Sequence, residues 1–388
     1  MLVVIVAGAF NRVASKIMTE PMGAYSFFLS LWNSIVYTLV YFIILFSRIG
    51  LKITPRSHLS FPWRSLKVPE NVGESRILRL WHRLPLIKLF IIMGFMDGLG
   101  NILGLMATPY ISGPLTSLTS QAIVVFSMLS AVILLRTKYT LWQCLAALIV
   151  LAGAIICLIP DLTNLGGNDN TGEPATKQLL YSILMAVSTA PNAISFTLKE
   201  FVFDVKNDLD VFVVNSHSSM WGLILWPIFV PLTLLFDQTN GQNLWKYLGN
   251  AFMCFTSHTP DDGQPHHTSC SVDPWPWVIY MCVNLVFNIS LLVLLKISSA
   301  LQGFMAIKAI LPISVLLFYI NWPLIGSTDI NFWILIGLAV VLTGLILFRL
   351  TTLWRDQMKG RAGCFSVIMP FGPFKPPPSL LEEDEFGE

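Results

Sequence analysis

The chain has 388 residues, of which 54% are hydrophobic and only 12% are charged, and its formal net charge is +2. Because soluble domains carry about 25% charged residues, this composition excludes an ordinary soluble fold. Six cysteines without a CxxC pair exclude a disulfide-rich scaffold and a zinc ribbon, and the balanced charge argues against a nucleic-acid partner.

Ten apolar segments of the chain are long enough to be membrane-spanning helices, each of which needs about 20 residues to cross the hydrocarbon core. They cover residues 2–18, 25–46, 86–107, 114–135, 141–159, 179–198, 211–236, 275–295, 300–322 and 332–350. The sequence therefore predicts an all-α integral membrane protein with ten transmembrane helices.

Lysine and arginine residues are distributed unevenly between the loops. If both termini lie on one side, nineteen of the 24 basic residues fall on that side, two on the other side and three within spans. Because basic loops remain in the cytosol, we expect both termini to be cytosolic. The loop 48–85 is then cytosolic, the loop 237–274 faces a lumen or the exterior, and the acidic, proline-rich segment 351–388 is a disordered cytosolic tail.

The two halves of the chain resemble each other at a nearly constant offset. Residues 101–105 match 288–292 and residues 121–127 match 308–314 at an offset of 187, and Trp142 and Gly153 fall on Trp333 and Gly344 at an offset of 191. Apolar helices match by chance, but polar and aromatic matches at a fixed offset are rare. Since a five-span unit must insert its second copy upside down, we expect a 5+5 inverted repeat, with units over 1–160 and 177–350 and the substrate path between them.

Charged residues inside a span cost about 2.5–3.5 kcal/mol on insertion scales, so they are usually retained at a cavity or beside a partner. Arg12, Lys16, Asp97 and Lys308 are of this kind. We expect Lys16, near the end of its helix, to extend to the lumenal surface. Burial disfavours the ionised form of a carboxyl group, so Asp97 is the candidate for proton coupling, with a structural ion pair to Lys308 or Arg12 as the alternative.

Amide side chains in the spans are further candidates for lining a substrate cavity, together with Arg12 and Lys308. They are Asn11, Asn101, Gln121, Asn215, Asn284 and Asn288. The alternative role for a buried amide is a hydrogen bond between helices, worth roughly 1 kcal/mol.

The loop 237–274 contains Cys254 and Cys270, which we expect to form a disulfide because both lie in the same non-cytosolic segment with 15 residues between them. Its three histidines, His258, His266 and His267, show no regular ligand spacing, so we expect no metal site. Their alternative role is to sense an acidic lumen.

No motif of an enzyme is present: the chain lacks HExxH, GxSxG, Walker and kinase patterns. A seven-helix receptor has a different number of spans, and a channel would show a filter loop rather than an inverted duplication. The sequence therefore favours a carrier that needs no cofactor and whose partners are small solutes, protons and the lipid bilayer.

Three sets of residues resemble the chloroquine-resistance-transporter-like family of the drug/metabolite transporter superfamily. They are Asn11-Arg12 with Gly23-Ala24-Tyr25-Ser26-Phe27, Met96-Asp97, and Lys199-Glu200-Phe201-Val202-Phe203. The resemblance implies ten helices around a cavity and proton-linked export of amino acids, short peptides or organic cations, drugs included, from an acidic vacuole or lysosome-like compartment. It also implies that Arg12 lines the cavity and that loss of its charge admits cationic drugs.

The same resemblance leaves alternatives open. Plant relatives look like plastid thiol carriers, which implies a glutathione or thiol carrier of the plastid envelope, and other branches of the superfamily imply a nucleotide-sugar or metabolite exchanger. Relatives like the parasite protein carry four cysteines in the long lumenal loop, whereas this loop keeps Cys254 and Cys270 alone.

Overall fold

The computed structural model describes residues 1–63, 86–135, 139–157, 159, 175–205, 209–236, 243–260, 268–270, 272, 274–297, 310–326 and 332–359. All named elements within these ranges are helices, and the extended pairing described there consists of two isolated β-bridges. Seven helical stretches are long and apolar enough to cross a membrane, which agrees with an all-α integral membrane protein. They are Leu2–Thr19, Gly23–Gly50, Leu86–Tyr110, Gly113–Leu134, Lys177–Phe203, Trp275–Leu294 and Phe332–Thr351.

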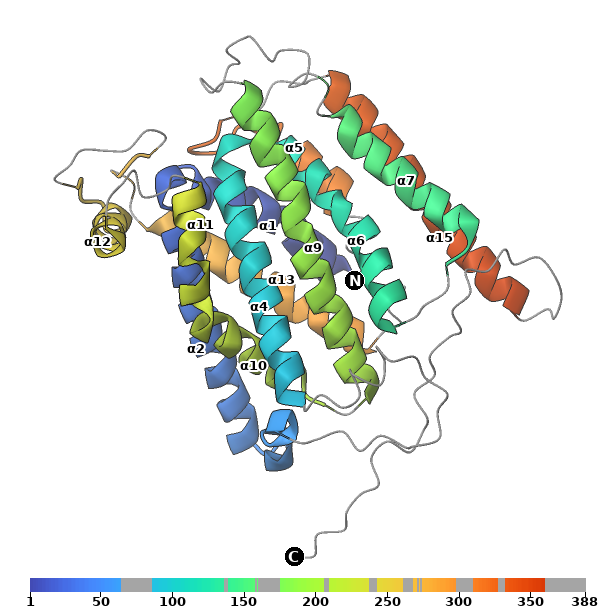
Figure 1. The fold of residues 1–388 in the computed structure, drawn as a ribbon, viewed down its shortest axis with the longest axis horizontal. Helices are drawn as coiled ribbons and strands as arrows, with labels where there is room; N and C mark the ends of the chain where they lie inside the picture. The colour runs from blue at the N-terminus through green and yellow to red at the C-terminus, as the bar shows by residue number, and fades with distance from the viewer. Residues whose placement is uncertain are drawn as a thin grey trace, which may run out of the picture.

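The first half of the chain supplies six of the labelled α-helices (Figure 1). They are α1 (Leu2–Thr19), α2 (Ser26–Gly50), α4 (Leu86–Ala107), α5 (Gly113–Thr119), α6 (Ile123–Ser130) and α7 (Leu141–Ile156). Short 3-10 turns join or follow them: η1 (Gly23–Tyr25), η2 (Arg56–His58), η3 (Phe61–Trp63), η4 (Thr108–Tyr110) and η5 (Ser120–Ala122). A π-helical turn, η6 (Ala131–Leu135), continues α6.

The second half supplies the remaining helices. They are α9 (Ala175–Val205), α10 (Val211–Ile224), the 3-10 turn η7 (Trp226–Phe229), α11 (Val230–Leu235), α12 (Leu244–Phe255), α13 (Trp275–Ile297) and α15 (Phe332–Lys359). Residues 310–317 are also helical.

Seven of the ten expected spans coincide with the candidate spans, and the other three differ. The helix α7 is shorter, at 16 residues. The expected span 211–236 is interrupted at η7, because Pro227 has no N–H to continue the helical hydrogen bonds. Residues 300–309 of the span 300–322 lie outside the described residues.

Three helices depart from the expected boundaries. The helix α9 continues seven residues past the expected end at 198, and α15 continues to Lys359 although we expected a disordered tail from 351. The expected loop 237–274 contains a further helix, α12. The rest of the tail, from residue 360, lies outside the described residues.

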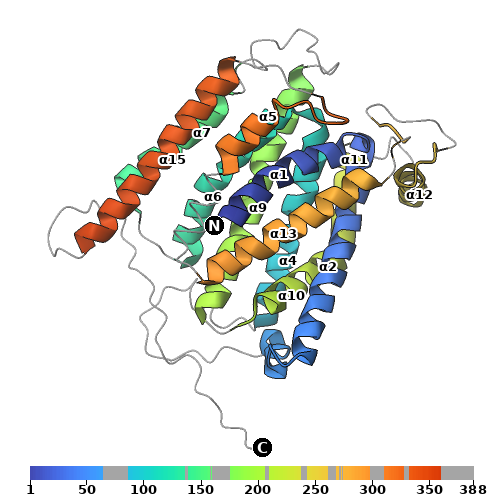
Figure 2. The same cartoon turned by 180° about the vertical axis from the view of Figure 1, so that it is seen from behind.

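The helix α4 lies among α2, α9 and α10, while α1 packs along α13. On one edge of the bundle α7 and α15 run side by side, as both views show (Figure 2). Two glycines let these backbones meet. A methyl group added at Gly153 would lie 2.8 Å from the backbone nitrogen of Val341, and one added at Gly344 would lie 2.9 Å from that of Val150. The two contacts are therefore reciprocal.

Two apolar clusters lie at opposite ends of α4. One contains Leu89 and Met93 of α4 with buried residues of α2, α9 and α10. The other contains Ile102 and Met106 of α4 with buried residues of α1, α2 and α12. Between these two clusters, in the middle of α4, lies Asp97.

Candidate functional site

Asp97 forms an ion pair inside the candidate membrane spans. Its Oδ2 atom accepts a hydrogen bond from Nζ of Lys199 on α9 at 2.7 Å and a second from Oγ of Ser218 on α10 at 2.9 Å. The Lys199 side chain is 12% exposed and the Asp97 side chain is 26% exposed. Because a charge in such a place persists only beside a partner, the pair explains how both residues are accommodated.

Small residues bring α10 close enough to reach Asp97. A methyl group added at Gly94, less than one turn before Asp97, would lie 2.6 Å from the Ser218 carbonyl oxygen and 2.6 Å from the Gly222 nitrogen. The ammonium group of Lys199 also lies over the ring of Phe196, 5.4 Å from its centroid. Cation–π contact of this kind adds to the stabilisation of a desolvated lysine.

The cation beside Asp97 was not the one expected. Sequence analysis placed Lys199 in a cytosolic loop because the span appeared to end at residue 198, whereas α9 continues to Val205 and carries Lys199. Of the two expected partners, Arg12 is wrong, because its Nη1 atom donates instead to Oγ of Ser120 at 2.6 Å. Lys308 lies outside the described residues.

A second, uncharged cluster surrounds Asn284 of α13. The Asn284 oxygen accepts hydrogen bonds from the Tyr37 hydroxyl of α2 and from the amide of Asn288, and its own amide donates to the Tyr280 hydroxyl at 3.0 Å. Tyr41 stacks on Tyr37 and interacts electrostatically with both Asp97 and Tyr280, so it connects the two clusters. Sequence analysis predicted a role for the two asparagines but missed the three tyrosines.

Asn284 and Asp97 are related by the repeat. Asn284 follows Asp97 by 187 residues, the offset that also relates Asn288 to Asn101. Each of the two residues accepts hydrogen bonds in the middle of a candidate span, from an ammonium and a hydroxyl group at Asp97 and from a hydroxyl and an amide at Asn284. The charged and the neutral cluster thus occupy equivalent positions in the two halves.

Lys16 does not extend to the surface as we expected. It is 8% exposed, and its Nζ atom lies 3.0 Å from the Glu20 carboxylate and 3.0 Å from each of the carbonyl oxygens of Thr108 and Pro109. Carbonyl oxygens at the end of a helix are favourable partners for a cation. Lys16 therefore fastens the end of α1 to the end of α4.

The remaining amide candidates are not brought together. Gln121 is 2% exposed and donates to the Ser117 carbonyl oxygen at 3.4 Å, and Asn215 is also buried. Asn101 is exposed. The Oδ1 atom of Asn11 is buried and finds no hydrogen-bond partner among the described residues. No hydrogen bond described in this part of the chain joins these four residues to one another.

A further ion pair links the end of α2 to the start of α10. Nε of Arg48 donates to Oδ2 of Asp210 at 3.0 Å, the Thr54 hydroxyl donates to the same oxygen, and the Phe212 nitrogen donates to Oδ1 at 2.9 Å. Burial alone would raise the pKa of Asp210, but the hydrogen bonds from Thr54, Phe212 and Arg48 outweigh it and hold the pKa below the ordinary value of 3.8. Sequence analysis missed this pair because both residues lie at helix ends.

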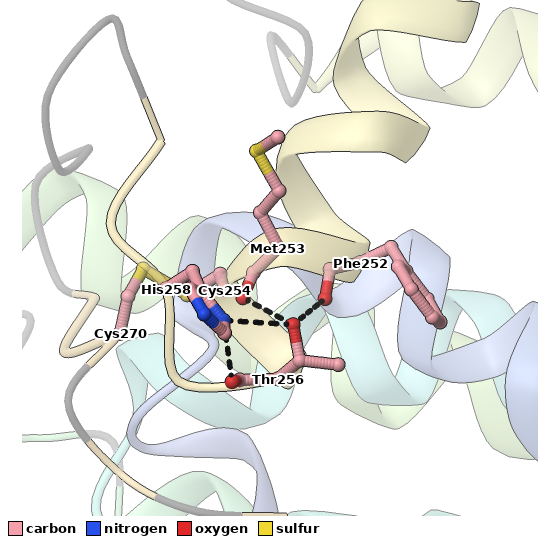
Figure 3. Close-up of a disulfide and its surroundings, with 6 residues drawn as sticks. All are labelled: Phe252, Met253, Cys254, Thr256, His258 and Cys270. Carbon is pink, nitrogen blue, oxygen red and sulfur yellow. Dashed lines mark hydrogen bonds between the residues drawn. A yellow bond between two sulfur atoms is a disulfide. The ribbon is translucent and has the colours of Figure 1, made fainter.

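Cys254 of α12 and Cys270 are joined by a disulfide, the pair that we expected (Figure 3). Beside the disulfide, the Ser269 nitrogen donates to the Pro21 carbonyl oxygen at 2.9 Å, and Thr268 pairs with Met22 in a β-bridge. The loop is thus attached to the turn between α1 and α2. His258 contacts Thr256, as Figure 3 shows, whereas His266 and His267 lie outside the described residues.

Known proteins resemble this chain over most of its length. Residues 72–348 match the model of the CRT-like, chloroquine-resistance transporter-like family. Protein CLT1, chloroplastic, from Arabidopsis thaliana is 28% identical over 351 residues, which cover 89% of this chain and 71% of the relative. Crt homolog 1 from Dictyostelium discoideum is 26% identical over 399 residues, covering 95% and 77%.

A third relative is the chloroquine resistance transporter of Toxoplasma gondii, which is 23% identical over 290 residues, covering 70% of this chain and 32% of the relative. The match to the family model extends over well more than half of the chain and includes Asp97, Lys199 and Asn284. Such a protein moves solutes across a membrane and is not an enzyme. The chain belongs to the CRT-like, chloroquine-resistance transporter-like family of multi-pass membrane transporters.

Proposed function

We propose that the protein is a secondary active transporter that exports small solutes from an acidic vacuole and couples this export to proton movement through Asp97. The solutes are amino acids, short peptides or organic cations. The observation that supports the proposal is the ion pair between Asp97 and Lys199, which joins α4 to α9 between two apolar clusters and which Ser218 extends to α10.

Protonation of Asp97 gives the pair two distinct states. The ionised carboxylate attracts the Lys199 ammonium and holds α4, α9 and α10 together, whereas the protonated form loses most of that attraction. A proton that enters from the acidic side therefore loosens three helices, and its release to the cytosol restores the contact. Because protonation favours one arrangement of the helices over the other, proton movement is coupled to solute movement.

The proposed architecture is a 5+5 inverted repeat of ten spans with both termini in the cytosol. Two observations support it. The contacts of Gly153 with Val341 and of Gly344 with Val150 are exchanged when each residue is replaced by its equivalent at the offset of 191. Reciprocal contacts of this kind are the signature of a two-fold relation between two copies. Asp97 and Asn284 also lie at equivalent positions.

Uptake into proteoliposomes tests the proposal. Labelled arginine, a short peptide and glutathione would be offered with and without an imposed pH gradient to wild type, Asp97→Asn and the control Asp210→Asn. We expect the gradient to drive accumulation in wild type and in the control. In Asp97→Asn we expect exchange of solute down its own gradient to continue while proton-driven accumulation is lost, which distinguishes lost coupling from misfolding. Equal accumulation by Asp97→Asn and wild type would refute the role of Asp97.

For Arg12 we propose a selective role: its positive charge disfavours cationic drugs in the substrate path, because like charges repel strongly where water is scarce. Its guanidinium group is held by Ser120 at the contact of α1 with η5. Chloroquine uptake should rise in Arg12→Thr and stay low in Arg12→Lys, which keeps the charge. Equal uptake by Arg12→Thr and Arg12→Lys would show that charge at this position does not select against cations.

The second candidate function is a plastid-type glutathione or thiol carrier. The observation in its favour is that the relative from Arabidopsis thaliana, whose name includes the word chloroplastic, matches 89% of this chain. Glutathione flux that ignores the pH gradient, in wild type and in Asp97→Asn alike, would support this function and a plastid envelope location. Asp97 and Lys199 would then form a structural ion pair.

A further inference from the structure

The helix α12 has apolar side chains on two opposite faces. One face packs on the bundle through Tyr247, Ala251, Cys254 and Phe255, all of which are buried. The other face presents large apolar side chains outward: Trp245 is 83% exposed, Phe252 is 49% exposed and Met253 is 44% exposed. These three residues lie at positions i, i+7 and i+8, so they share one side of the helix.

Contacts with the bundle hold this second face outward. The Tyr247 hydroxyl donates to the Ala24 carbonyl oxygen at 3.2 Å, and the disulfide between Cys254 and Cys270 fixes the last turn of the helix. Phe255 packs against Trp277 of α13. Because its inner face is fastened at both ends, α12 cannot turn to bury Trp245.

The axis of α12 runs across the bundle rather than along it. Figures 1 and 2 show α12 nearly end-on, beside the ends of α2 and α11, whereas α2, α4 and α9 run within the plane of the picture. If the long helices cross the membrane, the axis of α12 is parallel to the membrane plane. Its exposed face therefore lies at the level where the spanning helices end.

Aromatic residues of neighbouring helices gather at the same level. Trp32 of α2 contacts Phe252 and Trp277, with ring centroids 6.4 Å and 6.3 Å apart. Tryptophan is enriched where spanning helices leave the hydrocarbon core, because its ring is amphipathic. The outward face of α12 is thus continuous with the part of α2 that borders the lipid.

We infer that α12 lies in the membrane interface, with Trp245, Phe252 and Met253 inserted among the lipids of the leaflet beside the turn between α1 and α2. A helix that rests on a bilayer in this way buries one apolar face in the boundary between headgroups and acyl chains. The disulfide then holds an interfacial helix against the bundle. The inference depends on the long helices crossing the membrane and not on the identity of the solute.

Photo-crosslinking of the full chain in phospholipid vesicles tests the inference. The variants Trp245→p-benzoylphenylalanine and Phe252→p-benzoylphenylalanine place a photoreactive ring on the outward face. Leu39→p-benzoylphenylalanine, at an exposed position midway along α2, is the lipid-facing reference. Thr259→p-benzoylphenylalanine, at an exposed polar position four residues after α12, is the matched control in the same loop. Protection of Cys254 and Cys270 from alkylation before reduction verifies that each variant has folded.

Mass spectrometry of the irradiated protein then decides between three outcomes. We expect lipid adducts at positions 245 and 252 with a yield close to that at position 39 and several-fold above that at position 259. Yields no higher than at position 259 would show that the face is in water and would overturn the inference. Adducts that join two copies of the chain would overturn it as well, because the face would then be a contact between protomers.

Discussion

At the scale of single residues, Asp97 and Lys199 place two opposite charges where water is largely excluded. Removing one partner leaves the other uncompensated, which costs about 3 kcal/mol or more for a buried pair. Lys199→Met and Asp97→Asn should therefore each lower the free energy of unfolding by about this amount. The double variant should recover much of the loss, because no unpaired charge remains. Thermal unfolding of the purified protein in detergent micelles measures all three.

Lys177→Met is the matched control for this cycle, because Lys177 is an exposed lysine near the other end of the same helix α9. Its replacement should change the unfolding temperature little, as exposed charges contribute less than about 1 kcal/mol. If the losses in Lys199→Met and Asp97→Asn simply add in the double variant, the two side chains do not stabilise each other, and the proposed coupling through their contact is wrong.

The second ion pair, between Arg48 and Asp210, makes stability depend on pH. Because the folded protein holds the pKa of Asp210 below 3.8, the ionised carboxylate stabilises the folded state at any pH above the unfolded value of about 3.9. This contribution is lost as the pH falls through the lower folded value. Asp210→Asn should therefore be less stable than wild type by about 2 kcal/mol at pH 7, and the difference should shrink below about pH 4.

A series of unfolding measurements from pH 7 down to pH 3 checks this prediction. Arg48→Gln, which removes the partner, should show the same convergence with wild type at low pH. A difference between Asp210→Asn and wild type that is equally large at pH 7 and at pH 3 would mean that the ionised form of Asp210 contributes nothing and that the amide fails for a steric reason.

At the scale of elements, apolar composition predicts where helices lie but not where they end. Seven expected spans coincide with the candidate spans because each needs only a local run of apolar residues. The extension of α9 to Val205 was missed because Lys199 ends the apolar run, and its partner Asp97 lies 102 residues away in the chain. The helix α12 was missed because 12 residues are too few for a span.

The close crossing of α7 and α15 gives a prediction at this scale. A methyl group at Gly153 would meet the backbone of Val341, and one at Gly344 would meet the backbone of Val150, within 3 Å in each case. Backbone atoms yield less than side chains, so Gly153→Ala and Gly344→Ala should each lower the free energy of unfolding by about 1–3 kcal/mol. Because the contacts are reciprocal, the two losses should be similar.

Gly249→Ala is the control for these variants, because no atom lies within 4 Å of the added methyl group in α12. Alanine has the higher helix propensity, so this variant should be unchanged or more stable by up to about 1 kcal/mol. Thermal unfolding of the three variants side by side provides the comparison. If Gly153→Ala matched Gly249→Ala, α7 and α15 would not be in backbone contact.

At the scale of the whole molecule, the residues of the candidate site were predicted only in part. Asp97 and Asn284 were found because polar groups within apolar runs are conspicuous. Tyr37, Tyr41 and Tyr280 were missed, because a tyrosine is equally common in a packed core, and only the fold shows that their hydroxyl groups surround these two residues. Lys199 was missed because its helix was expected to end before it.

The inverted architecture leads to a last prediction, about which side of the membrane each end of the bundle faces. Figure 1 places the end of α2 with η2 at the bottom of the bundle and α12 at the top. A helix of 25 residues such as α2 is about 38 Å long, enough to cross a hydrocarbon core of about 30 Å. Arg48, Lys52 and Arg56 at the lower end favour the cytosol.

Cysteine labelling in sealed vesicles checks this orientation. In a chain that lacks Cys144, Cys157, Cys282 and Cys364, Arg56→Cys should react with an impermeant maleimide from the same side as a tag on the carboxyl terminus. Thr259→Cys should react only from the opposite side, because the loop that carries α12 leaves the membrane there. Equal reactivity of both positions from one side would mean that the two halves are not inverted, and the reciprocal contacts of α7 and α15 would then need another origin.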